Sequence, residues 1–304
     1  MVFASTKSFR SKEYILPAAL AIADCVVGLG QITSAPYRMY LLGTGQDNIL
    51  QTQWQCLWKF YNQCFIFGTF TVPTLLLLIS IDRLIACASI RTYLRIDKKL
   101  TIGFVTTGLS ISFGLHLLTI LISYMFSPEE GAAFPQICLT GWVAPRWYLK
   151  YVFHFFRFAA STVTLVIYLA AMLVLWRGRK NQPITDQLLA LKQKRQAKVT
   201  QMLMVVIFFG GVFYTIPSAI YYFGIVFQAP VSAVRIYGPI CWVLININSA
   251  NNIFIYFVKN KEIRNGAKRL FGLDTTEAVQ IIVPKAQPQS QGTGSTTAAA
   301  DNDK

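Results

Sequence analysis

The sequence predicts an all-α fold, a polytopic bundle of helices that crosses a membrane. The chain has 304 residues, of which 54% are hydrophobic and only 13% are charged, whereas soluble domains contain about 25% charged residues. The apolar residues also occur in runs long enough to span a bilayer, which takes about 20 residues of helix. Such hydrophobicity excludes disorder for most of the chain. The runs are also too long for the strands of a membrane barrel.

Six stretches have the length and composition of spanning helices. The first contains a single charge, Asp24, and the fourth contains a single charge, Arg157. The fifth is longer than one crossing, so we expect it to end in an extracellular loop near Gln228–Pro230, because proline breaks a helix. The six stretches are Tyr14–Tyr37, Phe60–Ile81, Leu100–Pro128, Tyr151–Trp176, Val199–Val234 and Ile236–Val258.

Basic residues alternate along the chain in a way that predicts the topology. Five Lys and Arg lie in residues 83–99 and seven in residues 177–198, whereas the loops between these segments hold few. Because loops rich in Lys and Arg stay in the cytoplasm, six crossings place both termini inside. The same loops account for much of the net charge of +15, so we expect membrane lipid as a partner and no nucleic acid. No signal peptide pattern opens the sequence.

Three segments outside the spans have a recognisable character. Residues 187–198 are basic and are expected to extend the fifth span as a cytoplasmic helix. Residues 259–272 place apolar residues on one face and basic residues on the other, which predicts a short amphipathic helix at the membrane interface. The polar tail over residues 273–304 is expected to be disordered. The predicted organisation is therefore a bundle over residues 1–272 followed by a cytoplasmic tail.

Polar residues inside the spans need an explanation, since an ionisable group at mid-depth costs about 2.5–3.5 kcal/mol. A carboxylate in one helix and amides in another can coordinate a small cation or a network of water molecules. Alternatively, the same polar side chains only hold the helices together. The sequence leaves both possibilities open. The residues concerned are Asp24 in the first span and Asn246, Asn248, Ser249, Asn251 and Asn252 in the last.

Four motifs in chain order resemble those of the class A, rhodopsin-like G-protein-coupled receptors. LAIAD resembles the second-helix motif of that family, and IDRL resembles its Asp-Arg-Tyr motif at the end of the third helix. FFGGVFYTIPS resembles the sixth helix around its proline, and NSANNIFIY resembles the Asn-Pro-x-x-Tyr region of the seventh. The resemblance covers roughly residues 10–272. SIDRLIA and the compact loops are most similar to the nematode serpentine chemoreceptors of the srsx type.

The resemblance implies a chemosensory receptor and not an enzyme. Such a receptor binds an extracellular ligand, here an unknown small molecule or peptide, and signals to a heterotrimeric G protein by outward movement of the cytoplasmic helix ends. It implies a place in the plasma membrane, with the cilium of a sensory neuron as one location, and no cofactor beyond a structural sodium ion. The implied coupling and activation residues are Asp82, Arg83, Tyr168, Pro217, Asn252 and Tyr256, and the implied sodium or water ligands are Asp24, Asn248, Ser249 and Asn252.

The chain departs from the family pattern in several places. It starts just before the second helix of the family, so the six spans would correspond to helices 2–7 of a seven-helix receptor that lacks its first helix. Ile253 stands where the family has proline, Thr215 replaces the sixth-helix tryptophan, and Val72 lies near the position of a sodium-binding serine. These departures keep a non-signalling, truncated receptor open as an alternative.

The outer half of the bundle must contain any ligand pocket. Arg157 inside a span suggests either an anionic ligand or an internal acidic partner, and aromatic residues with a few polar groups suit a small-molecule pocket. The alternative is that the arginine reaches out to the interface and that the aromatic residues form the interfacial belt. The pocket candidates are His154, Arg157, Tyr221, Tyr222 and Trp242.

Two of the six cysteines, Cys56 and Cys138, lie in predicted outward loops, which face an oxidising environment. We expect them to pair, and the family has this bridge between its third helix and its second extracellular loop. The alternative is that Cys56 is free.

A six-span transporter or channel and an intramembrane enzyme are the other classes to weigh. The sequence contains no filter-like motif and no matching pair of broken helices in two halves. Its two histidines, His116 and His154, form no metal-binding motif, and no catalytic residue is expected.

Overall fold

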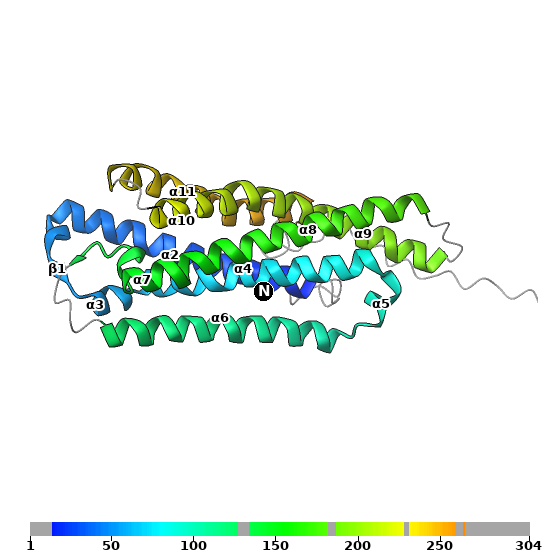
Figure 1. The fold of residues 1–304 in the computed structure, drawn as a ribbon, viewed down its shortest axis with the longest axis horizontal. Coiled ribbons are helices and arrows are strands. Elements are labelled where there is room, and N and C mark those ends of the chain that lie inside the picture. Colours follow the sequence, from blue (N-terminus) through cyan, green and yellow to red (C-terminus); the bar gives the residue numbers. More distant parts are fainter. Residues whose placement is uncertain (1–13, 127–133, 182–186, 228–230, 260–263, 265–304) are drawn as a thin grey trace, which may run out of the picture.

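The computed structural model of the chain is a bundle of long helices that run along one axis (Figure 1). The structure describes residues 14–126, 134–181, 187–227, 231–259 and 264. The long elements are α2 (Ile15–Thr44), α4 (Phe60–Ala88), α6 (Lys98–Phe126), α8 (Phe155–Asn181), α9 (Gln187–Gly210), α10 (Ile216–Val226) and α11 (Val231–Lys259). The short elements are η3 (Gln46–Asn48), β1 (Leu50–Gln51), α3 (Gln53–Leu57), α5 (Ile90–Arg95), β2 (Phe134–Pro135), η4 (Thr140–Trp142), α7 (Arg146–Tyr148), η5 (Leu149–His154) and η6 (Gly211–Thr215).

Five stretches of helix in the described part of the chain are long and apolar enough to cross a membrane. The helix α11 adds a sixth long helix of 29 residues, and the chain is an all-α polytopic bundle, as the sequence predicts. The helices α2 and α4 extend beyond the predicted spans, to Thr44 and Ala88, whereas α10 ends at Val226, before the loop expected near residues 228–230. Residues 187–198 are helical, as expected. Residues 228–230, most of the predicted interfacial helix and the tail over residues 273–304 lie outside the described residues.

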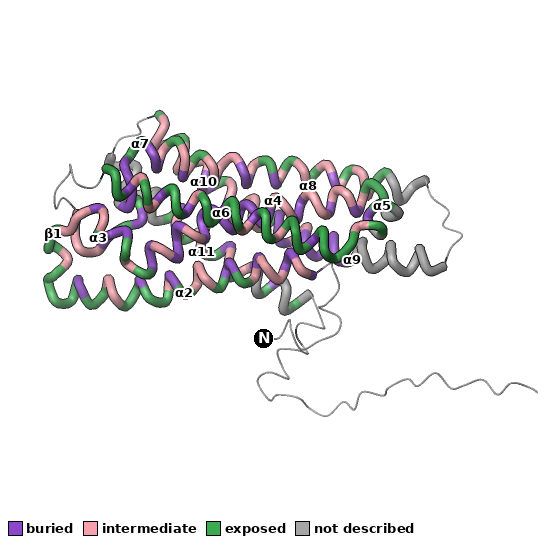
Figure 2. Tube along the Cα trace, turned by 90° about the horizontal axis from the view of Figure 1, so that it is seen from below, coloured by how far each residue is buried: buried purple, intermediate pink, exposed green. Residues whose placement is uncertain are grey.

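The bundle is organised around α4. Its most apolar window of 18 residues is 78% buried, against 22% for the corresponding window of α6, and it packs against α2, α6 and α8. Figure 2 shows the buried residues gathered in the middle of the bundle and exposed residues along α6. A side chain on α4 is therefore enclosed by other helices along most of its length.

The helix α6 has the distribution of residues that is typical of a lipid-facing helix. Its buried stripe consists of small or polar residues, whereas its exposed face carries large apolar side chains. In a bilayer the hydrophobic effect does not drive helices together, so contacts are made by small residues that allow close approach. The buried residues are Thr101, Gly108, Ser112, His116, Thr119 and Ser123, and the exposed ones include Phe104, Ile111, Phe113 and Leu121.

Two of the spanning helices contain a π-helical turn. The first, η5, joins α7 to α8, and the second, η6, joins α9 to α10 directly before Pro217. A proline in a helix removes one backbone hydrogen bond and clashes with the preceding turn, and a wider turn is one way in which a helix accommodates such a disturbance. The sequence predicts the disturbance at Pro217 but neither π turn, because no residue pattern marks one.

The end of the bundle that carries the strands, called here the outer end, holds a small cap (Figure 1). The strands β1 and β2 form an antiparallel ribbon in which Leu50 pairs with Pro135. Sequence analysis does not anticipate this ribbon, because two-residue strands leave no alternation to find, and the fold remains all-α. Cys56 and Cys138 form the expected disulfide, which confirms that pairing.

The disulfide belongs to a larger clamp on the loop around Cys138. Arg38 Nε donates to the carbonyl of Ile137 at 3.3 Å, and Tyr61 Oη donates to the same oxygen at 3.1 Å. Asn62 Nδ2 donates to the carbonyl of Cys56 at 2.8 Å and to that of Cys138 at 3.3 Å. The loop is thus fixed to the outer ends of α2 and α4.

Close packing of α2 on α4 gives a direct test of the fold. A Cβ atom at Gly30 would lie 2.9 Å from Cys64 Cβ and 3.0 Å from the Phe65 ring, whereas a Cβ atom at Gly28 meets nothing within 4 Å. We expect Gly30→Ala to destabilise the protein by about 1–3 kcal/mol through overpacking. The matched change Gly28→Ala should be neutral or stabilising by up to about 1 kcal/mol. Thermal unfolding in detergent measures both, and a Gly30→Ala protein as stable as Gly28→Ala would contradict the described packing.

Candidate functional site

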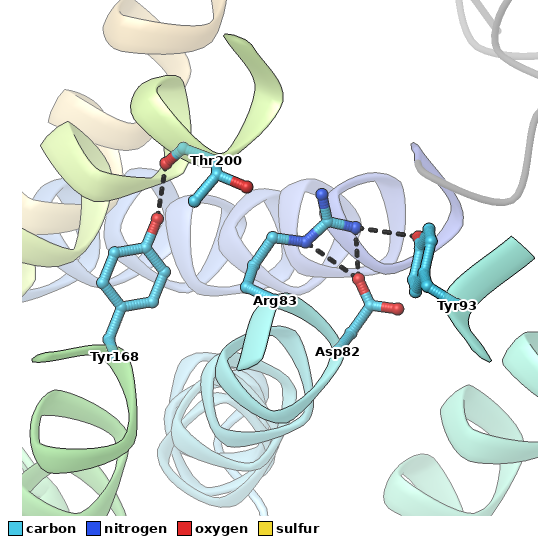
Figure 3. A network of polar contacts seen from close by, with 5 residues as sticks. All are labelled: Asp82, Arg83, Tyr93, Tyr168 and Thr200. Atoms are coloured by element: carbon cyan, nitrogen blue, oxygen red, sulfur yellow. Dashed lines mark hydrogen bonds and ion pairs between the residues drawn. The ribbon is translucent and has the colours of Figure 1, made fainter. Parts of the chain in front are cut away.

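The opposite, inner end of the bundle encloses an arginine. Asp82 and Arg83 lie in the last turns of α4, and Arg83 is only 1% exposed. Its Nε donates to Asp82 Oδ2 at 2.9 Å, and its Nη2 pairs with the same oxygen. Nη2 also donates to Tyr93 Oη at 3.0 Å (Figure 3). The guanidinium is therefore held by one carboxylate and one phenol.

The phenol comes from the short helix α5. Ser89 caps this helix, since its side chain accepts a hydrogen bond from the backbone N–H of Thr92. Tyr93 is 1% exposed, and its ring centroid lies 5.6 Å from Arg83 Cζ, within cation–π range. Sequence analysis missed this residue. The only available signal was an aromatic side chain in a polar, basic loop ten positions after Arg83.

A second contact closes the inner end beside Arg83. Tyr168 is buried on α8, and its Oη donates to the backbone carbonyl of Thr200 on α9 at 2.6 Å (Figure 3). This bond ties α8 to α9. Tyr256 lies in α11, and its side chain is outside the part that the structure describes. Its role in activation stays a prediction.

In the middle of the bundle, Asp24 on α2 meets the polar residues of α11. Asp24 is 2% exposed, Ser249 Oγ donates to its Oδ1 at 2.9 Å, and Asn252 Nδ2 donates to its Oδ2 at 3.1 Å. Asn248 is also buried but does not bond to Asp24. Instead, it lines a neighbouring cavity of about 20 Å³ together with Asn252. The expected contact between the first and last spans is therefore present.

The oxygen atoms around Asp24 suit a hard cation or water. The Oδ1 atoms of Asn248 and Asn252 are buried and accept no hydrogen bond from any described residue, and carboxylate, hydroxyl and amide oxygens are typical ligands of such ions. Val72, which is buried, supplies no oxygen where the family has a serine. The donor set fits a sodium ion or ordered water, and that role stays a prediction.

The structure separates the five residues predicted for the outer pocket into two groups. Arg157 and Trp242 line one cavity of about 30 Å³ together with Tyr214. The His154 ring lies 4.8 Å from that of Tyr221, and Tyr222 stacks on Phe158 at 5.5 Å. These three residues form an aromatic cluster where η5 and α8 meet α10, and they are not among the residues that line the cavity.

Arg157 does not reach out to the membrane interface, so that alternative is wrong. Its side chain is 5% exposed, and its Cζ lies 4.7 Å from the centroid of the Tyr214 ring. The predicted internal acidic partner is also absent from the part of the chain that the structure describes, where the recorded ion pair joins Arg83 to Asp82. Sequence analysis missed Tyr214, since an aromatic residue in an apolar helix carries no signal of its own.

The contact between Asn252 and Asp24 gives a measurable energy. Hydrogen bonds to a charged group contribute about 1.5–3 kcal/mol, so Asn252→Ala should destabilise the protein by about that amount. Asn246 serves as a control in the same helix, because its Nδ2 donates only within α11, to the carbonyl of Trp242. In a double-mutant cycle with Asp24→Ala, Asn252→Ala should be non-additive and Asn246→Ala additive in chemical denaturation. Additive effects for both pairs would show that the contact carries no energy.

Comparison with known proteins agrees with this geometry. Among the described residues, no group of three or more His, Cys, Asp and Glu side chains could hold a metal ion. A search of curated proteins finds no match to the chain. The sequence model of one family, described as serpentine type 7TM GPCR chemoreceptor Srsx, matches residues 1–271. This match covers almost the whole chain, which folds as a multi-pass helix bundle with an outer disulfide. The chain therefore belongs to the Srsx family of serpentine chemoreceptors.

Proposed function

We propose that the chain is a chemosensory receptor that binds an extracellular ligand in the outer half of the bundle and couples to a heterotrimeric G protein at the inner end. The observation that carries this proposal is the enclosure of Arg83. A guanidinium that is 1% exposed at the end of the central helix is out of reach of any cytosolic protein. Its contacts with Asp82 and Tyr93 thus describe a closed state, and coupling requires a second state in which Arg83 is released.

Two of the contacts at the inner end are single hydrogen bonds. Tyr93 holds Arg83 through one hydrogen bond, and Tyr168 holds α9 through another. The bond from Tyr168 contributes about 0.5–1.5 kcal/mol net, and the bond from the charged Arg83 contributes about 1.5–3 kcal/mol. A ligand that prefers the open state by a few kcal/mol therefore shifts the equilibrium. The π turn η6 and Pro217 interrupt the regular helix between α9 and α10, and we place the hinge for the outward movement of α9 there.

Asp24 lies in the middle of the bundle, between the outer half and the inner end. Because it joins α2 to α11 through Ser249 and Asn252, we propose that it holds the two helices in register, with sodium or water bound at its oxygen atoms. The proposed location is the plasma membrane, and the cilium if the cell is a sensory neuron. A six-span transporter or channel is not favoured, because the family consists of receptors.

Releasing Arg83 should activate the protein without any ligand. Tyr93→Phe removes the hydrogen bond to Arg83 but keeps the ring, so we expect ligand-independent nucleotide exchange on a co-reconstituted G protein to rise at least about 10-fold. Arg83→Ala should abolish exchange, alone and in combination with Tyr93→Phe, at unchanged surface expression.

Tyr40→Phe is the matched control, since Tyr40 is 61% exposed on α2, and it should behave as wild type. If Tyr93→Phe leaves basal exchange unchanged, Tyr93 is not part of a closing contact. If Arg83→Ala couples normally, the proposed mechanism is wrong.

A further inference from the structure

We propose that the ligand carries a carboxylate, and that Arg157 binds it side-on through Nε and Nη2. This inference rests on the proposed receptor function, in which the ligand enters the outer half of the bundle. It adds the chemical class of the ligand and the atoms that recognise it.

Two hydrogen-bond donors of Arg157 have no acceptor among the described residues. Nε and Nη2 of Arg157 are buried, and neither has a hydrogen-bond partner among the described residues. These two N–H groups lie on the same edge of the planar guanidinium and point the same way, with the spacing of the two oxygens of a carboxylate. A whole edge of the arginine is thus available, and one anionic group can satisfy it.

A second buried arginine among the described residues, Arg83, shows how a carboxylate occupies this edge. In Arg83 the same two atoms, Nε and Nη2, both pair with the carboxylate of Asp82. Arg157 is almost as deeply buried, at 5% exposed, but Asp24, the acid buried in the middle of the bundle, is already bonded through both oxygens to α11. The partner of Arg157 is therefore best supplied by a bound molecule.

Burying the charge of Arg157 without an anionic partner costs free energy. An uncompensated charge inside a bundle costs several kcal/mol, and the Tyr214 ring beneath the guanidinium, at 4.7 Å, offsets about 2 kcal/mol of this. An apolar side chain at this position would avoid the cost of burying an unpaired charge. A buried arginine that stands there nevertheless is typical of a binding residue.

The cavity beside Arg157 has the size of the expected group. Its volume is about 30 Å³, which is room for about two water-sized atoms and matches the two oxygens of one carboxylate. Asn246 and Ser249 add polar atoms to the wall, whereas Phe65 and Trp242, packed edge to face at 5.2 Å, add apolar surface. The ligand that fits is a small carboxylate with an apolar body.

The body of such a ligand does not fit in the closed structure, so its entry must widen the cavity. The walls come from α2 and α4 on one side and from α8, η6 and α11 on the other, the last three through Arg157, Tyr214 and Trp242. Tyr214 belongs to the π turn directly before Pro217. Displacement of Tyr214 by a ligand would act on the proposed hinge itself, which connects recognition of the carboxylate to the opening of the inner end.

The test uses the full chain in lipid nanodiscs, with straight-chain alkanoates of three to eight carbons as probes and the primary amides of equal length as uncharged controls. We expect alkanoates, but not amides or sodium chloride at equal ionic strength, to raise the midpoint of thermal unfolding of the wild type. Arg157→Gln should abolish the effect. Arg157→Lys, which keeps the charge but loses the side-on pair of donors, should weaken binding at least about 10-fold. Arg146→Gln, at an exposed position in the same span, should behave as wild type.

A second variant keeps the test informative if Arg157→Gln folds poorly. Arg157→Met removes the unpaired charge, so without any probe it should melt at a higher temperature than the wild type, by roughly 2–4 °C or more. A purely structural arginine predicts the opposite shift. The proposal is overturned if Arg157→Met melts lower, if amides or chloride stabilise the wild type as well as alkanoates do, or if no alkanoate stabilises it. Basal exchange by Tyr93→Phe, measured in the same nanodiscs, shows separately whether the receptor function stands.

Discussion

Charges inside a membrane bundle must be compensated, and this requirement governs the whole molecule. Among the described residues, the ionisable side chains of Asp24, Arg83 and Arg157 lie deep among the helices. Asp24 is compensated by hydroxyl and amide donors from α11, and Arg83 by Asp82 and Tyr93. Arg157 has an aromatic ring beneath it and two donors that bond to no described residue. The first two charges thus hold the closed bundle together, whereas the third leaves one position to be filled by a ligand.

The central helix connects these positions. The helix α4 contacts the neighbours on several sides, carries Arg83 at its inner end, and lies against the disulfide-bonded loop at its outer end. Because that loop is fixed by Arg38, Tyr61 and Asn62, α4 and its cap form a rigid reference. The helix that contains η6 and Pro217 is joined to α8 at its inner end by the bond from Tyr168 to Thr200, and its regular hydrogen bonding is interrupted at η6. Movement is therefore expected in α9 relative to α4.

Much of the fold could be predicted from the sequence, for a physical reason. An uncharged run of about 20 residues must form a helix to satisfy its backbone hydrogen bonds in a bilayer, so the spans follow from composition alone. The meeting of Asp24 with Asn252 could also be anticipated, because a carboxylate inside a span demands a polar partner. What could not be predicted depends on packing across the chain. The two-residue ribbon at Leu50 and Pro135, the π turn before Pro217 and the contact of Tyr93 with Arg83 leave no periodic pattern. The burial of Arg157, as opposed to a position at the interface, depends on which face of α8 meets η6.

The central claim is that the inner end exists in a closed and an open state that differ in the position of α9 relative to α4. The most direct measurement is the distance between spin labels at Ala88→Cys and Gln201→Cys, both at exposed positions, in a background without other free cysteines. The account predicts one short distance for the receptor alone and a second, longer distance when a nucleotide-free G protein is added. A single distance that G protein leaves unchanged would contradict it.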